Sequence, residues 1–283
     1  MTHFIINPNA GTKKKSQYLA LIASIKSDPL HYVWETSHPL EASILTRNAV
    51  EMGANRIIAV GGDGTINEVA SVLVGSSIPL GVIPIGSGNG LARHLGIPMI
   101  PSKALEIAKK HAAQKMDVGR FNDRYFFCTA GIGFDASVAH RFAKASGRGL
   151  MNYIKATFYT LFNFEPIEIN LDNTSEEAIF SLTIANANQF GNDAYISPMS
   201  NVQDGFLEII KIKKLSLIQA TVIGIRLFMG TIHHSNNVEI TSLKGIKIKY
   251  HRNAPYHLDG EQLFTEKDEI QIQILPNALN VIC

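Results

Sequence analysis

The chain changes character partway along its length. Over roughly the first 118 residues, short apolar runs alternate with amphipathic segments, and the run at 56–60 is followed by apolar residues spaced three and four apart over 66–74. That spacing predicts a helix after a strand, and the repeated order predicts a parallel, layered α/β domain. From about residue 120 most segments alternate as strands do, and few helices are expected, most clearly at about 135–163 and 215–230. This pattern predicts an antiparallel sandwich or distorted barrel.

The length of 283 residues fits two domains. We expect an α/β domain at 1–120 and a β-sandwich domain at 121–283. Whether the C-terminal tail packs back on the first domain stays open at this stage.

Composition excludes few classes of protein. The formal net charge of +2 is too small to indicate a nucleic-acid binder by itself. Cys128 and Cys283 stand in unrelated surroundings, without zinc or disulfide spacing, so we expect a reducing, cytoplasmic compartment. The N-terminus is typical of a first strand, and the apolar segment 217–230 is interpreted as a buried helix because it is short and contains Arg226.

Two glycine-rich turns, at 61–65 and 86–90, each follow a predicted strand. Ligands collect at the carboxyl ends of such strands, where unpaired helix N–H groups attract anions and glycine permits unusual angles and close approach. Thr65 is expected to cap the following helix, and the charge of Asp63 suggests a bridging Mg²⁺. The pair of turns predicts a phosphate site, the alternative being two tight loops.

Common phosphate-binding patterns do not account for these turns. The P-loop pattern is absent, since Gly-Lys occurs nowhere in the chain. A Rossmann-like match at 131–136 falls in the β-rich half and has no partner acid about 20 residues later, so we interpret it as a chance match.

Four segments occur in order along the chain: GGDGTINEVASVL, PIGSGNGLARHLGIP, MDVGRFNDRYFFCTAGIGFDA and HLDGEQL. Together they resemble the diacylglycerol kinase catalytic-domain family, which includes bacterial soluble lipid kinases and the sphingosine and ceramide kinases. The resemblance runs over nearly the whole chain and includes NPNAG near its start. GGDGT alone is shared with NAD kinases, whereas the full ordered set is specific.

The resemblance implies that the α/β domain at 1–120 binds the nucleotide and has a layered sheet similar to that of NAD kinase and phosphofructokinase. It also implies that ATP binds between the two domains. The positions that match the family's nucleotide-binding residues are Asn7, Thr36, Gly61, Gly62, Asp63, Gly64, Thr65, Asn67, Ser87, Asn89 and Asp117. Asn7 and Thr36 each end a predicted strand at the same sheet edge, which agrees with this role. By themselves they would be interpreted as turn residues, and Asp117 could instead close a helix–strand connection.

The resemblance also implies a catalytic element at HLDGEQL. Glu261 would be the general base that takes the proton from a lipid hydroxyl, and Asp259 would orient the site or help hold metal, with Asp63 serving Mg²⁺. The alternative from the residues alone is an Asp-Gly hairpin turn followed by an exposed glutamate.

A magnesium loop is implied at SPMSNVQDGFLEII. Asp204 would supply a carboxylate, with the carbonyls of Asn201 and Phe206 as companions, and another Asp-Gly hairpin is the alternative. The expected cofactors are therefore ATP and Mg²⁺.

The acceptor is left open by one departure from the family pattern. The second loop has Ser87 in Gly-Ser-Gly-Asn, a form similar to the sphingosine kinases, where many bacterial diacylglycerol kinases have threonine. We expect diacylglycerol or a related lipid at a membrane surface, bound peripherally. A sphingoid base or ceramide, a soluble acceptor such as NAD, and a non-catalytic sensor remain alternatives. The basic–aromatic stretch 140–164 is expected to wall a lipid pocket or to pack in the core.

Overall fold

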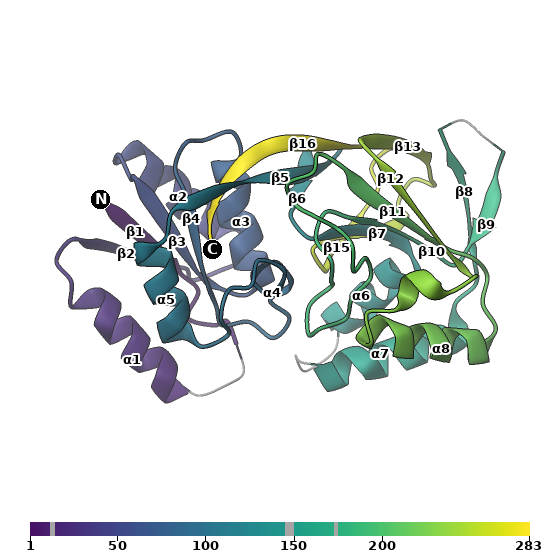
Figure 1. Cartoon of the computed structure of the whole chain (residues 1–283), viewed down its shortest axis with the longest axis horizontal. Coiled ribbons are helices and arrows are strands. Elements are labelled where there is room, and N and C mark those ends of the chain that lie inside the picture. The colour runs from purple at the N-terminus through teal and green to yellow at the C-terminus, as the bar shows by residue number, and fades with distance from the viewer. Residues whose placement is uncertain (12–14, 145–149, 173–174) are drawn as a thin grey trace. The chain divides into compact units, whose positions relative to one another are not determined.

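The computed structural model describes residues 1–11, 15–144, 150–172 and 175–283 (Figure 1). The chain divides into two compact units. The first unit comprises Met1–Met116 together with Asn277–Cys283, and the second unit comprises Asp117–Pro276.

A parallel sheet forms the centre of the first unit. Its strands lie in the order β2 (His31–Glu35), β1 (Thr2–Ile6), β3 (Arg56–Gly61) and β4 (Leu80–Pro84), and the end of β16 (Glu269–Ile282) pairs with β4. Every one of these pairings is parallel. Side chains of β3 and β4 are almost all buried, as expected for a parallel sheet with both faces covered.

Helices connect these strands. They are α1 (Lys15–Lys26), α2 (Glu41–Glu51), α3 (Asp63–Leu73), α4 (Gly90–His94) and α5 (Pro101–Lys110), as Figure 1 shows. The apolar stripe predicted for the helix after β3 is the buried face of α3, through Ile66, Val69, Ala70 and Leu73. Strand–helix alternation therefore builds the layered α/β unit that the sequence predicts.

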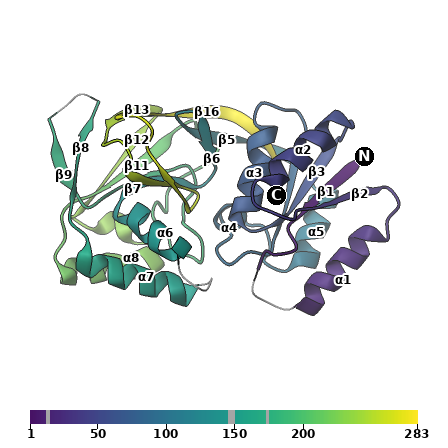
Figure 2. The same cartoon turned by 180° about the vertical axis from the view of Figure 1, so that it is seen from behind.

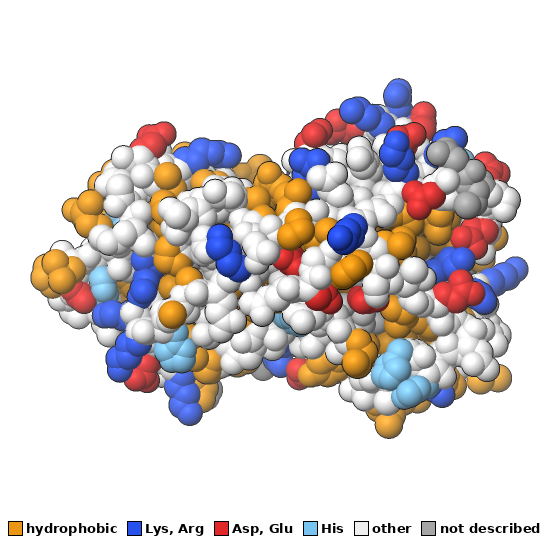
Figure 3. Space-filling view, turned by 45° about the horizontal axis from the view of Figure 1, so that its top comes forward, with side chains coloured by type: hydrophobic (Ala, Val, Ile, Leu, Met, Phe, Trp, Pro, Cys, Tyr) orange, Lys and Arg blue, Asp and Glu red, His pale blue; other side chains and the backbone are white. Residues whose placement is uncertain are grey.

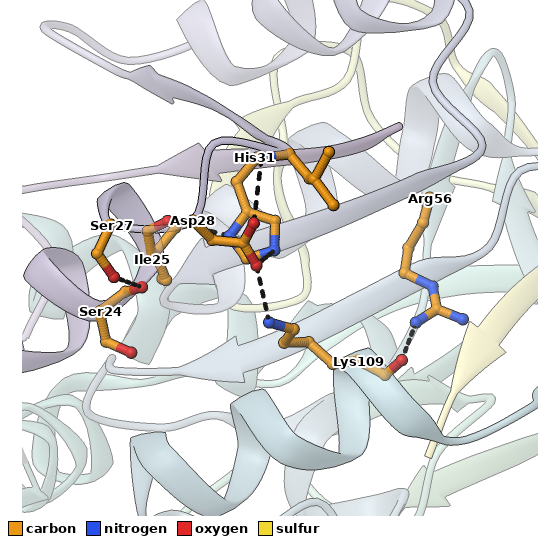
Figure 4. A network of polar contacts seen from close by, with 8 residues as sticks. Ser24, Ile25, Ser27, Asp28, His31, Arg56 and Lys109 are labelled. Carbon is orange, nitrogen blue, oxygen red and sulfur yellow. Dashed lines mark hydrogen bonds and ion pairs between the residues drawn. The ribbon is translucent and has the colours of Figure 1, made fainter.

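A polar network fastens the amino-terminal ends of β2 and β3 (Figure 4). His31, the first residue of β2, lies 3.1 Å from the Asp28 carboxylate and 3.0 Å from the Ile25 carbonyl. Lys109 of α5 lies 3.4 Å from Asp28, and its carbonyl accepts a hydrogen bond from Arg56 at the start of β3. The hydrogen bond from the Leu30 amide is the largest cause that lowers the pKa of Asp28, and His31 and Lys109 lower it further. This network stabilises the sheet edge opposite the glycine turns.

The second unit contains an antiparallel β-sandwich. One sheet has the order β12 (Val238–Leu243), β11 (Leu207–Ile212), β10 (Ser181–Ala185), β7 (Thr129–Gly133), β14 (Pro255–Leu258) and β15 (Glu261–Phe264). The other contains β16, β13 (Gly245–Lys249), β8 (Ile167–Leu171), β9 (Glu177–Ile179), β5 (Ala113–Phe121) and β6 (Arg124–Phe126). A core that includes Ile132, Leu182 and Ile272 draws on both sheets. The predicted fold class, an α/β unit followed by an antiparallel sandwich, is confirmed.

Helices α6 (Phe134–Lys144), α7 (Leu150–Asn163) and α8 (Leu217–Phe228), with the short 3-10 helix η1 (Ile232–His234), complete the second unit. Leu161 of α7 and Ile223 and Leu227 of α8 pack against one apolar cluster. Figures 1 and 2 both show α7 and α8 side by side. The interpretation of 217–230 as a buried helix is wrong on burial, since Ile223 alone is buried in α8.

Candidate active site

The carboxyl ends of four neighbouring strands meet at one edge of the parallel sheet. The Thr36 amide donates to the Ile6 carbonyl at 2.8 Å, and the Asn7 amide donates to the Val60 carbonyl at 2.9 Å. One strand further along, the Ile85 amide donates to Gly61 at 2.9 Å. Asn7, Thr36 and both glycine turns therefore lie along the same edge, where ligands of α/β sheets bind.

The two glycine turns pack backbone against backbone. A Cβ atom on Gly86 would lie 2.6 Å from the Gly62 Cα, and one on Gly61 would lie 2.4 Å from the Thr65 Cβ. Gly61 and Gly62 do not have left-handed φ angles. Close approach, rather than unusual backbone angles, is therefore why these positions need glycine: the other turn lies against Gly62 and Gly86, and Thr65 lies against Gly61.

Close approach of neighbouring atoms does not explain why residue 64 is glycine. It is exposed in the first turn of α3, its φ is not left-handed, and an added Cβ would meet nothing within 4 Å. Glycine inside a helix costs about 0.5–1 kcal/mol relative to alanine. Its missing side chain leaves open space beside the helix N-terminus, where backbone N–H groups and the dipole favour anions.

Asp63 binds the second glycine turn directly. Its carboxylate accepts hydrogen bonds from the Asn89 and Gly90 amides, each at 2.7 Å. These amides, at and just before the start of α4, offset part of the negative charge of Asp63. That Asp63 also serves Mg²⁺ stays a prediction.

The prediction that Thr65 caps α3 is wrong. The helix begins at Asp63 and Gly62 occupies the N-cap position, so Thr65 lies inside the first turn. Thr65 is buried, and its hydroxyl accepts a hydrogen bond from Asn7 Nδ2 at 3.0 Å. This bond joins the end of β1 to the start of α3.

The remaining predicted nucleotide residues of the first unit lie on the same two segments. Asn67 is on α3, where its Oδ1 accepts from Ser71 Oγ at 3.3 Å, and Ser87 is partly exposed in the second turn. Asn89 is buried with a φ of 53°, and its Nδ2 donates to the Gly86 carbonyl at 2.9 Å. Asn89 therefore shapes the second turn from inside.

The second unit holds the Asp-Gly-Glu element on a tight hairpin. Asp259 and Gly260 have φ angles of 49° and 81°, and Leu258 of β14 lies opposite Glu261 of β15. Two successive positive φ angles are typical of a type I′ turn. The hairpin alternative is thus present together with the exposed glutamate, and it does not exclude a catalytic role.

Three backbone amides hold the Asp259 carboxylate. Phe127, Cys128 and Thr129 donate to it at 2.9, 2.7 and 3.0 Å, and the Asp259 amide donates to the Thr129 carbonyl at 2.8 Å. Charge-assisted bonds of this kind are stronger than neutral ones. They fix the turn against the start of β7 and leave Glu261, the next residue but one, exposed to solvent.

A buried histidine–aspartate pair, which the sequence did not reveal, lies next to this hairpin. His257 Nε2 on β14 is 3.3 Å from the Asp135 carboxylate at the start of α6, and Thr183 Oγ1 donates to the same carboxylate at 2.7 Å. His257 Nδ1 is buried without a partner among the described residues. Burial first, and then the Asp135 charge, raise the pKa of Tyr250 to about 12.

The His257–Asp135 pair explains why glycine stands at residue 131, within the Rossmann-like pattern that we interpret as a chance match. A Cβ on Gly131 would lie 2.0 Å from Asp135 Oδ2 and 2.5 Å from His257 Nε2, so glycine makes room for these two side chains. The glycine at this position was the available signal. Its use could not be inferred because Asp135 and His257 are far apart in the chain.

Asp117 lies on β5 and contacts the loop that carries Asp204. Buried Asp117 accepts a hydrogen bond from the Gly205 amide at 2.7 Å, and its own amide donates to the Val202 carbonyl at 2.7 Å. Exposed Asp204 accepts from the Phe206 amide at 2.9 Å, while the Asn201 side chain accepts from Gln203. Within the described part of the chain, no group of three or more His, Cys, Asp or Glu side chains is arranged around a common point for a metal.

A cavity of about 630 Å³ opens in the second unit. Its walls are Ser137, His140, Arg141, Thr160, Asn163, Phe164, Pro255 and Phe264. Thr160 Oγ1 and His140 Nδ1 are buried without a partner among the described residues. The stretch 140–164 therefore supplies most of a cavity wall with basic, polar and aromatic groups, although 145–149 lies outside the described residues.

Comparison with protein families matches both halves of the chain. The diacylglycerol kinase catalytic domain matches residues 1–121, and the YegS C-terminal NAD kinase beta sandwich-like domain matches residues 128–283. A diacylglycerol kinase of Mycobacterium tuberculosis is 30% identical over 256 residues, which cover 86% of this chain and 81% of that protein. A Chromohalobacter salexigens protein named "Probable lipid kinase YegS-like" is 29% identical over 249 residues, covering 83% and 78%.

Solved structures share the fold. The crystal structure of a diacylglycerol kinase from Bacillus anthracis aligns with a TM-score of 0.72 and 22% identity, covering 99% of this chain and 96% of that one. The two matching domains and the 30% identical relative show that the chain belongs to the lipid kinase family defined by the diacylglycerol kinase catalytic domain.

Proposed function

We propose that this protein transfers the γ-phosphate of ATP to a hydroxyl group of diacylglycerol or a closely related lipid. The observation that carries the proposal is the exposed Glu261 on a hairpin whose neighbouring Asp259 is held by three backbone amides. Such a turn keeps one carboxylate accessible and fixes its position. A relative with 30% identity is itself named a diacylglycerol kinase.

The donor site is the carboxyl edge of the parallel sheet. The helix N-terminus of α3 and the open space beside Gly64 suit the phosphates of a nucleotide. The partly exposed members of this edge, Asn7, Asn67 and Ser87, supply polar side chains for the rest of ATP. Asp63, Thr65 and Asn89 act indirectly, since their side chains hold the two turns in shape.

Glu261 is the general base of the proposed reaction. Its carboxylate accepts the proton of the lipid hydroxyl as that oxygen forms a bond to the γ-phosphorus, and the bond from phosphorus to the β,γ-bridging oxygen breaks to release ADP. Asp259 positions the turn rather than accepting the proton, because its oxygens already receive three N–H donors.

Magnesium is the expected partner of ATP in this reaction. When bound, Mg²⁺ neutralises charge on the phosphates. The loop that carries Asp204, together with Asp117 of β5, offers carboxylates and backbone carbonyls, an oxygen donor set of the kind that Mg²⁺ prefers. Asp204, with the carbonyls of Asn201 and Phe206, would hold an ion there, and buried Asp117 would hold the loop.

The cavity lined by residues of α6, α7, β14 and β15 is the proposed acceptor site. Phe164, Pro255 and Phe264 provide apolar surface for a lipid chain, while His140 and Thr160 provide hydrogen-bonding groups for a polar head. Phe264 lies on β15, the strand that begins with Glu261. Because the second glycine turn has Ser87, a form similar to that of the sphingosine kinases, a sphingoid base or ceramide is the second candidate acceptor.

The test is transfer of label from ATP with Mg²⁺ to micelles containing diacylglycerol, ceramide or sphingosine, with NAD as a soluble acceptor. Glu261→Ala should lower transfer about 10²- to 10⁴-fold, since a general base contributes about that much. Its melting temperature should not change, because the side chain is exposed. Labelled NADP would replace the lipid proposal, and a variant with full activity would remove Glu261 from its role.

A further inference from the structure

Helix α8 presents an apolar stripe to solvent. Ile218, Ile225 and Met229 are 78%, 56% and 68% exposed, and Val222 and Phe228 are also exposed. These residues recur at helical spacing, so they line one face of α8 and the residue that follows it. The opposite face carries Ile223, which packs into the core. A single helix thus has one apolar stripe for the core and a second that no described residue covers.

Helix α7 has a matching stripe. Met151, Phe158, Tyr159 and Phe162 are exposed, and Lys155 lies among them at the same helical spacing. Both helices pack their inner faces on the same cluster and lie side by side in the second unit (Figure 2). We call the outer side chains of the two helices the α7–α8 face. Exposed apolar surface of this extent marks an interaction site.

Charge separates the α7–α8 face from the rest of the second unit. Neither helix contains Asp or Glu, whereas Lys155, Arg226 and, just before α8, Lys214 are cationic. The nearest acidic residue after α7 is Glu165. Elsewhere the charges are mixed: Lys211 pairs with Glu177 and Glu239, and Figure 3 shows acidic and basic side chains together over the second unit.

We propose that the α7–α8 face rests on an anionic lipid bilayer. Interfacial helices of this type combine aromatic and aliphatic side chains with cations and avoid acidic groups. Lys155 can extend its ammonium group to the lipid phosphates while its stem stays among the apolar side chains. No helix in the described ranges is long and apolar enough to cross a bilayer, so the contact we propose is peripheral.

The location of this face suits access to a lipid. Thr160, Asn163 and Phe164, at the end of α7 and just beyond it, line the cavity of the second unit. The same helix therefore contributes to the proposed bilayer contact and to the proposed acceptor site. Bilayer binding itself does not depend on which lipid is phosphorylated.

Vesicle sedimentation with the full chain tests the proposal. Vesicles of phosphatidylcholine alone are compared with vesicles that also contain phosphatidylglycerol. The wild type should bind the anionic vesicles, and high salt should weaken binding because exposed charges are screened. Ile218→Ser, Ile225→Ser and Met229→Ser combined should lower the affinity at least about tenfold, since each removes apolar surface from the contact.

A matched control is Met199→Ser, because Met199 is 79% exposed but lies outside both helices. It should bind vesicles as the wild type does, and circular dichroism should show that each variant is folded. Transfer of phosphate to a short-chain diacylglycerol dispersed in detergent should be unchanged in the α8 variant. If the wild-type protein binds vesicles but transfers no phosphate in this assay, only the proposed function is refuted, and the proposed bilayer contact is not.

Equal vesicle binding by the α8 variant and the wild type would overturn the proposal, as would no binding by the wild type. A concentration-dependent dimer that the α8 variant abolishes, measured by light scattering, would assign the α7–α8 face to a second copy of this chain and would likewise overturn it.

Discussion

Asp63 in the first unit and Asp259 in the second stand in similar short motifs, yet each has a structural task. Both carboxylates accept hydrogen bonds from consecutive backbone amides, two for Asp63 and three for Asp259. An aspartate beside glycine in a motif of this kind is easily assigned to metal or to catalysis. The comparison teaches that such a residue can instead build the turn that presents its neighbours.

What each turn presents is different. Next to Asp63 the exposed residue is Gly64, so the first unit offers bare backbone at a helix N-terminus. Near Asp259 the exposed residue is Glu261, so the second unit offers a carboxylate. Backbone amides bind anions and a carboxylate accepts protons, which divides binding and proton transfer between the two units in the proposed reaction.

The largest predicted effect is that of Asp259→Asn. The variant loses the charge that three amides share, and an amide NH₂ would face N–H donors, so we expect a loss of about 3 kcal/mol in the free energy of unfolding. Phosphate transfer should also fall at least about tenfold, because Glu261 would be less well positioned. Denaturant unfolding followed by circular dichroism measures the first effect.

The control is Glu261→Gln, which should lower transfer without changing the unfolding free energy. An Asp259→Asn protein with unchanged stability would show that its amide contacts are not what holds the hairpin, and the comparison with Asp63 would fail.

A smaller loss, about 2 kcal/mol, is expected for Asp63→Asn, which weakens two amide contacts instead of three. The change should raise the KM for ATP because the two glycine turns would separate. Trp34 is the single tryptophan and belongs to the first unit, so its fluorescence reports on that unit. The control is Asp204→Asn, because the Asp204 carboxylate is exposed and accepts a hydrogen bond within its own loop. An equal loss of unfolding free energy in this variant would show that the contacts of Asp63 with the second glycine turn do not cause the loss.

Gly64→Ala should stabilise the protein and impair nucleotide binding at once. The helix should gain about 0.5–1 kcal/mol because the added methyl group meets nothing in the protein. The KM for ATP should rise, since that methyl group would occupy the proposed phosphate space. Gly224→Ala on α8 is the matched control: it also has open space and should stabilise without affecting KM. Equal KM values for both variants would contradict a ligand at Gly64.

The smallest effect is a pH dependence confined to the first unit. His3 is fully buried and its Nδ1 accepts a hydrogen bond from Trp34 Nε1 at 3.1 Å. Burial first, and then the N-terminal ammonium group, lower the pKa of His3 below its ordinary 6.5. The unfolded chain then binds a proton that the folded chain resists, so stability is complete above about pH 6.5 and falls as the pH drops below it.

Unfolding in urea at pH 7.5 and 5.5, followed by Trp34 fluorescence, measures this dependence. The His3→Gln variant should lose part of the difference between the two pH values. A wild type and variant with the same pH dependence would show that protonation of His3 does not limit the stability of the first unit.

Periodicity succeeded for α3 and misled for α8. In α3 a single apolar stripe faces the sheet, so spacing and burial agree. In α8 two apolar faces exist, and spacing alone does not tell which one meets the core. Nor could the sequence reveal the Asp135–His257 pair, because the antiparallel pairing of β7 with β10 and β14 brings its members together.

Local patterns of amino acids were enough to predict the alternation of strands and helices in the first unit, the two glycine turns, the Asp-Gly hairpin and the family resemblance. These depend on hydrogen bonding and side-chain spacing over a few residues. Packing between segments far apart in the chain sets which groups donate hydrogen bonds to Asp63, Asp259 and Asp135, and which face of α8 stays exposed. Cys128, which donates to Asp259, is 131 residues away in the chain, and only sheet pairing brings a carboxylate to such a partner.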